Sequence, residues 1–198
     1  LDSSYKFHQI THGLEEHGIT LSKPKLELSK MMERKNSIVK KLTSGVSQLF
    51  AHNKVASIHG RGKLIDQNTV EVTDDKGKKK KVTAKNIILA TGSRPINIPS
   101  VPWNGTTIIG SSGALELTEV PKNLAIIGAG VIGLELGSVW SRLGSKVEIF
   151  EAEKEFLPML DKDVSRVIER EFRNQNLNIN IVIFCYFNKR FLCRQNIA

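Results

Sequence analysis

The sequence predicts an α/β fold whose carboxyl-terminal half contains a parallel sheet. Residues 124–174 run in the order strand, helix, strand, helix, and strands joined through a helix lie parallel with right-handed crossovers. Residues 55–84 instead consist of short strand-like runs separated by turns, which is the pattern of an antiparallel meander. With 198 residues and 40% hydrophobic residues, the chain is large and apolar enough to bury a core.

Helical patterns occupy the beginning of the chain. Residues 1–18 are predicted to form a helix that ends at Gly18, and Pro24 suits the first turn of a long helix that runs to about residue 52. Apolar residues recur along this long helix at the spacing of one face. We expect them to form a buried stripe: Leu28, Met31, Met32, Ile38, Val39, Leu42, Val46, Leu49 and Phe50.

Four short strands are expected in the meander: Val55–His59, Lys63–Ile65, Thr69–Thr73 and Val82–Ala84. Between the last two lies a lysine cluster around Gly77, made of Lys76, Lys78, Lys79, Lys80 and Lys81. We interpret it as a solvated hairpin tip with Gly77 in the turn, and a patch for phosphate or an acidic membrane surface is the alternative. The net charge of +9 does not indicate nucleic-acid binding, because no aromatic residues interleave with the lysines.

A second type of strand follows the meander. Residues 86–92 are predicted to form a buried strand that ends at Gly92 and breaks into Ser93-Arg94-Pro95. Residues 95–121 then carry four of the six prolines, and this change in composition marks a boundary between domains.

The glycine-rich segment after the boundary is the most informative motif. Residues 124–127 are predicted to form a fully buried strand, and the turn Gly128-Ala129-Gly130-Val131-Ile132-Gly133 leads directly into a helix. Gly128 permits the tight turn, Gly130 allows close approach of a phosphate, and Gly133 allows the helix to pack on the strand. The alternative is an ordinary strand–helix–strand unit with a glycine turn.

The elements after the turn fit a dinucleotide site. Residues 130–143 form the predicted helix, with Gly144 as its carboxyl-terminal cap and an inner face of Val131, Leu134, Val139 and Leu143. The next strand, 146–150, ends at Glu151, where a carboxylate would meet the adenosine ribose. A further helix should run from Asp161 to about Asn174, with an inner face of Val164, Val167, Ile168 and Phe172.

The remaining features exclude some functions. No apolar run has membrane-spanning length, and neither the five histidines nor Cys185 and Cys193 have metal-site spacing, so we expect no metal. After Ile181 the pattern changes, and residues 182–198 form either a β-rich segment or an atypical tail, possibly out of frame. A start at Leu1 without a signal-peptide pattern suggests a processed chain or a fragment.

Three motifs together resemble the dihydrolipoamide dehydrogenases, a family of flavoprotein disulfide reductases. They are Ile88-Leu89-Ala90-Thr91-Gly92-Ser93-Arg94-Pro95, Ser111-Ser112-Gly113-Ala114-Leu115-Glu116-Leu117 and the run from Gly128 to Trp140. The resemblance implies tandem Rossmann-like domains for FAD and NAD, both incomplete. Residues 1–112 would be the latter part of the FAD domain, 113–181 the first part of the NAD domain, and 182–198 the tail.

The resemblance also implies cofactor contacts. Gly62, in a Gly60-Arg61-Gly62 turn, and Thr91, Gly92 and Ser93 would lie against FAD. Gly128, Ala129, Gly130, Val131, Ile132, Gly133, Leu134 and Glu135 would bind NAD, with Glu151 on the adenosine ribose. Because a carboxylate accepts hydrogen bonds from ribose hydroxyls and repels a 2′-phosphate, we expect NAD rather than NADP. Glu135 could equally be a solvent-exposed helix residue.

The implied reaction oxidises protein-bound dihydrolipoamide and passes electrons through a disulfide and FAD to NAD. The family's redox cysteine pair and His-Glu base are expected outside this chain, so no residue here is assigned a catalytic role, and the chain alone should be inactive and retain little FAD. Implied partners are the lipoyl-bearing component of 2-oxo-acid dehydrogenase complexes and, in the intact family, a second copy of the chain. The implied location is the bacterial cytoplasm or the mitochondrial matrix.

Two alternatives to this function remain. The chain could belong to another disulfide reductase, similar to glutathione or mercuric reductase, or it could be an inactive truncated nucleotide-binding product.

Overall fold

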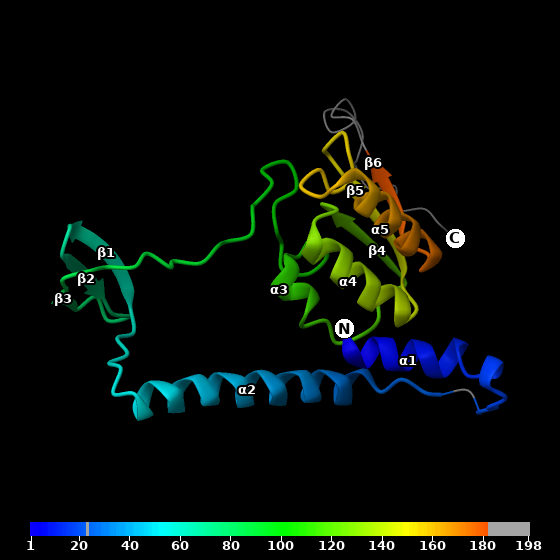
Figure 1. Cartoon of the computed structure of the whole chain (residues 1–198), viewed down its shortest axis with the longest axis horizontal. Coiled ribbons are helices and arrows are strands. Elements are labelled where there is room, and N and C mark those ends of the chain that lie inside the picture. Colours follow the sequence, from blue (N-terminus) through cyan, green and yellow to red (C-terminus); the bar gives the residue numbers. More distant parts are fainter. Residues whose placement is uncertain (23, 182–198) are drawn as a thin grey trace. The chain divides into compact units, whose positions relative to one another are not determined.

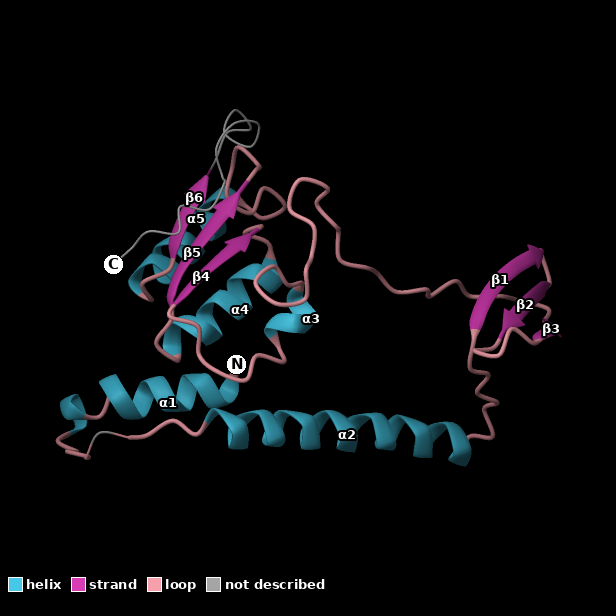
Figure 2. Cartoon of the chain, turned by 180° about the vertical axis from the view of Figure 1, so that it is seen from behind, coloured by secondary structure: helices cyan, strands magenta, loops and turns pink. Residues whose placement is uncertain are grey.

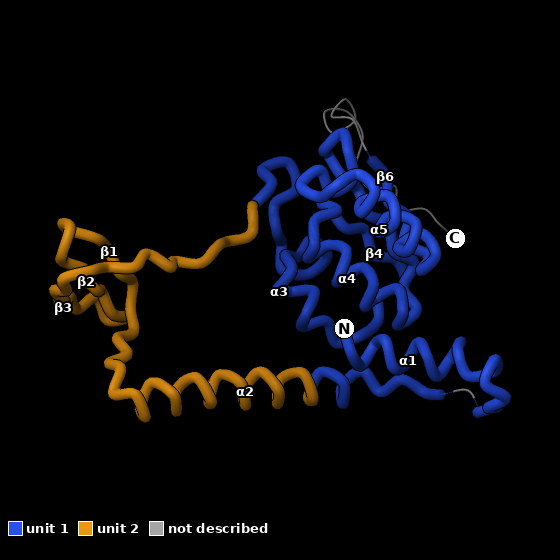
Figure 3. Tube along the Cα trace, viewed as in Figure 1, with its two compact units in different colours: residues 1–32, 97–198 blue, residues 33–96 orange. Residues whose placement is uncertain are grey.

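The computed structural model describes residues 1–22 and 24–181. The chain divides into two compact units (Figure 3). Unit 1 comprises Leu1–Met32 and Asn97–Ala198, and unit 2 comprises Glu33–Ile96. In the part of the chain that the structure describes, no helix is both long enough and apolar enough to cross a membrane.

Unit 1 contains the predicted parallel sheet. Its strands are β4 (Asn123–Ile127), β5 (Lys146–Glu151) and β6 (Asn178–Ile181), in that order and all parallel. Helix α4 (Val131–Arg142) connects β4 to β5, and α5 (Lys162–Asn174) connects β5 to β6. Both helices lie on the same face of the sheet (Figures 1 and 2), as expected when successive right-handed crossovers join neighbouring strands. The predicted strand–helix–strand–helix order is confirmed.

The core of unit 1 lies between this sheet and its helices. Gly137 of α4 allows the helix to approach the sheet, because a Cβ atom at this position would lie 3.1 Å from Cδ1 of Ile149 and 3.3 Å from Cδ1 of Ile126. The buried apolar residues are Ala129, Leu134, Trp140, Leu143, Val147, Ile149, Phe156, Leu157, Leu177 and Ile179.

Two details of the predicted burial in this region are wrong. Strand β4 is not fully buried: Leu124 and Ile126 are half-buried, while Ala125 and Ile127 are exposed. The reason is that α4 and α5 cover one face of the sheet (Figure 2), so side chains that alternate along the strand meet different surroundings. Val131, predicted on the inner face of α4, is 63% exposed at the helix start.

Helix α5 begins where the sequence predicts. Asp161 caps its first turn by accepting a hydrogen bond from the amide of Asp163 at 2.9 Å. Ile168 and Phe172 pack against the core as predicted. Val164 and Val167 are about half exposed, so the inner face of α5 is narrower than the sequence pattern indicates.

The amino-terminal residues also belong to unit 1. Helix α1 (Asp2–His12) is followed by a single 3₁₀ turn, η1 (Glu15–His17), and Gly18 ends this turn in the left-handed region at φ 70°. The predicted helix over residues 1–18 is therefore interrupted at Gly13. The guanidinium carbon of Arg142 lies 5.5 Å from the ring centroid of Tyr5, which joins α1 to the end of α4. A short helix, α3 (Ser111–Ala114), precedes β4.

The long helix α2 spans Leu28–His52. It begins four residues after Pro24, so the prediction that Pro24 lies in its first turn is wrong. The predicted buried stripe is also wrong, because no residue of α2 is buried. Leu28, Met31 and Met32 pack partly against the core of unit 1, whereas the later apolar residues of the stripe, such as Leu42 at 66%, are exposed. Helical periodicity fixes which residues share a face, and burial also needs an element that packs on that face.

Unit 2 contains the antiparallel meander. Strands β1 (Arg61–Asp66), β2 (Thr69–Thr73) and β3 (Lys79–Thr83) form a sheet in the order β1-β2-β3. Gly77 lies in the β2–β3 turn at φ 79°, and its amide donates to the carbonyl of Asp74, so the predicted turn at Gly77 is confirmed. The predicted extent of the hairpin tip is wrong, because Lys79, Lys80 and Lys81 belong to β3 and pair with β2. Residues 55–59 are not a strand. In the predicted turn, Gly60 forms a bend, whereas Arg61 and Gly62 already belong to β1.

The predicted buried strand over residues 86–92 is not formed. These residues have no regular secondary structure, and Ile88 is 91% exposed. A strand needs neighbours that satisfy its backbone groups, and no strand of the described chain pairs with this segment. Cys185, Cys193 and the predicted tail at 182–198 lie outside the described residues.

Candidate functional site

The candidate site is the glycine turn between β4 and α4. The amide of Gly128 donates to the carbonyl of Phe150 in β5 at 2.8 Å, which extends the β4–β5 pairing into the turn. Gly128 has φ 104°, a conformation that side chains of L-residues rarely adopt. The chain therefore leaves the sheet through a position that favours glycine and enters α4 at Val131, three residues later.

The other two glycines of the turn differ in what surrounds them. A Cβ atom at Gly133 would collide with the carbonyl oxygen of Gly128, which is backbone and cannot rotate away. A Cβ atom at Gly130 would meet nothing within 4 Å. Gly133 is thus required for the packing of α4 against the turn, while the open space beside Gly130 leaves room for a ligand to reach the backbone.

The start of α4 offers unpaired donors to that space. Gly130 is the amino-terminal cap residue, in an extended conformation, and no side chain caps the first turn. The first amides of a helix have no partner within the helix, and the helix dipole adds partial positive charge at this end. An uncapped start of a twelve-residue helix beside open space suits the pyrophosphate of a dinucleotide.

Glu151 is held at the same place by two backbone amides. Its Oε2 atom accepts a hydrogen bond from the amide of Ala129 at 2.7 Å, and its Oε1 atom accepts one from the amide of Glu153 at 2.9 Å. The carboxylate at the end of β5 is therefore fixed against the glycine turn that follows the neighbouring strand, β4. Each carboxylate oxygen can accept more than one hydrogen bond, so both retain capacity for a ligand hydroxyl.

The remaining predicted residues of this site divide into two groups. Ala129, at 1% exposed, and Leu134, at 3%, direct their side chains into the core, so they support the turn. Val131, Ile132 and Glu135 are exposed on α4. All the predicted nucleotide residues from Gly128 to Glu135, together with Glu151, belong to unit 1.

The predicted flavin residues lie in unit 2. Gly62 is in β1, where it pairs with Val72 of β2. Thr91, Gly92 and Ser93 are exposed and have no regular secondary structure, and Gly92 has φ 72°. These four residues form no site within unit 2 by themselves.

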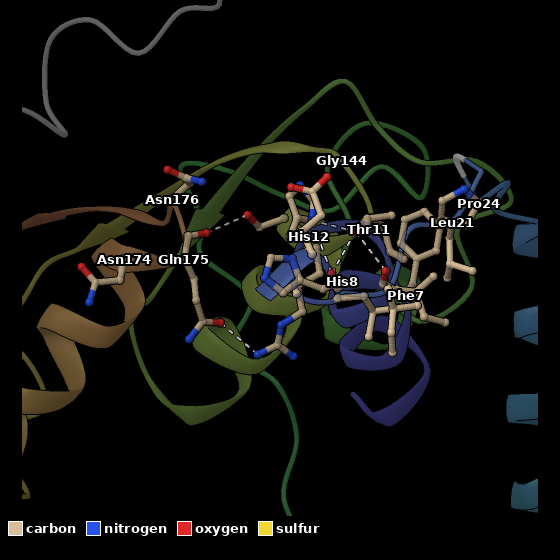
Figure 4. Close-up of a pocket in the computed structure, with 18 of the residues that line it drawn as sticks. Phe7, His8, Thr11, His12, Leu21, Pro24, Gly144, Asn174, Gln175 and Asn176 are labelled. Atoms are coloured by element: carbon tan, nitrogen blue, oxygen red, sulfur yellow. Dashed lines mark hydrogen bonds between the residues drawn. The ribbon is translucent and has the colours of Figure 1, made fainter. Parts of the chain in front are cut away.

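One feature of unit 1 was not expected from the sequence. His8 and His12 of α1 stack with ring centroids 4.8 Å apart, and they line a cavity of about 640 Å³ together with Arg142 (Figure 4). The spacing of four residues between the histidines placed them on one face of a helix, but nothing in the sequence indicated that Arg142 lies beside them. The structure holds no group of three or more acidic, histidine or cysteine residues suited to a metal ion among its described residues.

A parallel strand–helix–strand unit with an uncapped glycine turn and a carboxylate at the end of its second strand has the geometry of a dinucleotide-binding module. Comparison with known proteins identifies the family to which this module belongs. Residues 8–183 match the pyridine nucleotide-disulphide oxidoreductases, and the chain belongs to this family. The family's chemistry uses a flavin and a pyridine nucleotide.

Its curated relatives include dihydrolipoyl dehydrogenases. The mitochondrial dihydrolipoyl dehydrogenase of Pisum sativum is 38% identical over 181 residues, covering 91% of this chain and 36% of that protein. The dihydrolipoyl dehydrogenase of Cupriavidus necator is 40% identical over 185 residues, covering 91% and 38%. A leghemoglobin reductase of Glycine max is 39% identical over 181 residues, covering 91% and 35%. The chain thus spans little more than a third of the length of these relatives.

Solved structures agree on the fold. LpdA of Mycobacterium tuberculosis superimposes with a TM-score of 0.71 at 24% identity, covering 89% of this chain and 40% of that one. The HOCl-induced flavoprotein disulfide reductase RclA of Escherichia coli gives a TM-score of 0.64 at 28% identity, covering 87% and 38%. Both support the predicted α/β architecture of a disulfide reductase.

Proposed function

We propose that unit 1 of this chain binds NAD as part of a dihydrolipoyl dehydrogenase that also uses FAD. The observation that carries this proposal is the Glu151 carboxylate, which two backbone amides fix beside an uncapped glycine turn. In this arrangement the pyrophosphate would lie over Gly130 and the first amides of α4. The two hydroxyls of the adenosine ribose would donate to Glu151.

The charge around Glu151 favours NAD over NADP. Glu153 and Glu155 follow it within four residues, with Lys154 between them. A 2′-phosphate on the ribose would be placed next to the Glu151 carboxylate, and a fixed carboxylate repels it. Because both oxygens of Glu151 are already bonded to backbone amides, the side chain cannot turn away without losing those bonds.

For the flavin, the proposal extends to the region before the glycine turn. Residues 1–112 would be the latter part of the FAD-binding domain and 113–181 the first part of the NAD-binding domain. Gly62, Thr91, Gly92 and Ser93 would contact FAD through backbone, since Gly92 lacks a side chain and has a left-handed conformation. Glu135 is included in the NAD site because it is exposed on α4, two turns or fewer from Gly130.

The reaction of the whole enzyme is proposed from its relatives. Bound FAD and NAD would supply the electron transfer, and the residues of this chain would bind the nucleotide, orient it and offer the first amides of α4 to its phosphates. The substrate would be dihydrolipoamide on the lipoyl-bearing component of a 2-oxo-acid dehydrogenase complex, and the intact enzyme would be a homodimer. The relatives include mitochondrial plant proteins and a bacterial one, so the mitochondrial matrix or the bacterial cytoplasm is the proposed location.

A titration of the 198-residue chain with each nucleotide tests the central proposal. Calorimetry should detect NADH binding, with NADPH binding at least about tenfold more weakly, as expected for a repelled 2′-phosphate. Circular dichroism of the same sample verifies that the helices are formed. A folded chain that bound neither nucleotide, or that bound NADPH as tightly as NADH, would contradict the assignment.

A further inference from the structure

A cavity of unit 1 lies at the end of α4 opposite to the glycine turn. It has a volume of about 640 Å³ and is formed by α1, the segment that follows it, the end of α4 and the turn between α5 and β6. This volume falls within the range of small-molecule sites, which is roughly 300–1,000 Å³. Since α4 has twelve residues, the cavity and the turn are separated by about 18 Å along the helix axis, at 1.5 Å per residue.

Three basic side chains gather on one side of this cavity. His8 and His12 stack on each other (Figure 4), and Arg142, in the last turn of α4, lines the same cavity. Glu15 is the one acidic residue among those that line the cavity, and it forms no ion pair with the three within the described chain. Three neighbouring basic groups without a paired acid repel one another when charged, and an anion between them removes this repulsion.

The hydrogen bonds already present leave donors for such an anion. Nη2 of Arg142 donates to Oε1 of Gln175 at 2.9 Å, so the other guanidinium N–H groups remain for an oxyanion, which matches their planar fork. The Thr11 hydroxyl lies within hydrogen-bonding distance of the carbonyls of Phe7 and His8. Because that hydroxyl donates to a carbonyl, Nδ1 of His12, 2.6 Å from it, acts as the donor. Protonation at Nε2 then adds a charge and a second donor to His12.

Apolar side chains also line the cavity. Phe7, Leu14, Ile19 and Leu21 contribute to its lining, and the cavity is larger than an inorganic oxyanion needs. We propose that this cavity binds a small-molecule oxyanion with an apolar body, whose phosphate or carboxylate group is held by His8, His12 and Arg142. The site is independent of the nucleotide site at the glycine turn.

Binding at this site should depend on pH in one direction. Burial, and then the nearby His12 and Arg142 charges, hold the pKa of His8 below its usual value. The groups facing His8 are Tyr5 and His12 on α1, Arg142 on α4 and Glu15 on η1, while the α5–β6 turn contributes only amides. A bound anion favours the protonated imidazole of His8, so the affinity for the anion should rise as the pH falls toward the lowered pKa of His8.

The test is a titration of the 198-residue chain with phenyl phosphate and with inorganic phosphate. The imidazole signals of the five histidines in NMR spectra monitor the binding. Phenyl phosphate should shift the signals of His8 and His12, and bind more tightly than inorganic phosphate and more tightly at pH 6 than at pH 8. His12→Gln and Arg142→Gln should each weaken binding about tenfold, the effect of one lost charge-assisted hydrogen bond. The control His52→Gln, at the end of α2, should leave it unchanged.

Several results would overturn the proposal. They are equal shifts at all five histidines, unchanged affinity in His12→Gln, affinity that rises with pH, or displacement of phenyl phosphate by NADH. Arg142→Gln would lose the contacts of Arg142 with Tyr5 and Gln175 and could fail to fold for that reason. His12→Gln changes an exposed residue, so this variant would still decide the outcome.

Discussion

The amide of Ala129 and the carboxylate of Glu151 form a 2.7 Å hydrogen bond that ties the glycine turn to the end of the neighbouring strand. The two residues are 22 positions apart, and parallel pairing of β4 with β5 brings them together. The Ala129 side chain is in the core, so this amide is fixed in position. The orientation of the carboxylate is therefore a consequence of the fold and exists before any nucleotide binds.

This bond leads to the first prediction, that Glu151→Arg changes nucleotide preference. The substitution removes the carboxylate that would accept from the ribose hydroxyls, and the new guanidinium group could donate two hydrogen bonds to a 2′-phosphate. NADH affinity should fall about tenfold or more, and NADPH affinity should rise relative to it. Calorimetric titration of both nucleotides measures the ratio. Retention of the wild-type preference would refute the role of Glu151, and Glu33→Arg, at an exposed position of α2, is the matched control.

A second prediction separates Gly130 and Gly133, the two glycines at the start of α4. Gly133→Ala places a Cβ atom against the Gly128 carbonyl, and overpacking of this kind costs about 1–3 kcal/mol or more of unfolding free energy. Gly130→Ala meets open space at a compatible φ of −74°. Its unfolding free energy should change by less than about 1 kcal/mol, because loss of a good cap residue is offset by a stiffer unfolded chain.

Nucleotide binding should depend directly on Gly130, although substitution of this residue hardly changes stability. Gly130→Ala should fold normally and bind NADH about tenfold more weakly or worse, because its methyl group fills the space proposed for the pyrophosphate. Thermal unfolding and NADH titration of the two variants together make the comparison. If Gly130→Ala bound NADH like the wild type, the pyrophosphate would have to lie elsewhere.

The parallel unit could be predicted from sequence because its determinants are local. Gly128 and Gly144 mark turns, Asp161 marks the start of α5, and apolar strands lie between them. Each of these signals acts within a few residues. The glycine turn and Glu151 were predictable for the same reason, since the spacing of a strand–helix–strand unit brings them to one edge of the sheet.

The errors have a common physical cause. The stripe on α2 and the segment at 86–92 have the apolar patterns of buried elements, yet residues such as Leu42 and Ile88 are exposed. A pattern identifies a face, and burial depends on a second element that the pattern does not contain. The cavity beside His8 was missed for the related reason that Arg142 is distant in sequence and reaches α1 only through the packing of α1 on α4.

The start of α5 gives a third prediction. The Asp161 side chain accepts from the amide of Asp163 at 2.9 Å, and removing such a cap typically costs about 1 kcal/mol. Asp161→Ala should lower the unfolding free energy by about that amount, while Asp161→Asn, which retains a cap oxygen, should lower it by less. Chemical denaturation measures both. Equal losses for alanine and asparagine would show that the hydrogen bond contributes nothing.

The fourth prediction concerns pH. Burial, followed by the charges of His12 and Arg142, lowers the pKa of His8 from 6.5. A group with a lowered folded pKa binds its proton more tightly in the unfolded chain. His8 therefore contributes stability above pH 6.5, and this contribution is lost as the pH falls below 6.5 toward the lower pKa of the folded state.

Other shifted groups act in a separate range. Hydrogen bonds from the Asn68 backbone, and then from the Thr69 side chain, lower the pKa of Asp66. The Lys79 ammonium lowers the pKa of Glu71 from 4.5. Their contributions are lost only as the pH falls below the ordinary carboxyl pKa values.

The measurement is made between pH 7.5 and pH 5.5 in a buffer without phosphate. In this range the unfolding free energy of the wild type should fall because His8 takes up its proton more readily in the unfolded chain. His8→Gln should flatten this slope and His52→Gln should preserve it. Denaturation at several pH values measures the slopes, and an unchanged slope in His8→Gln would remove His8 from this role.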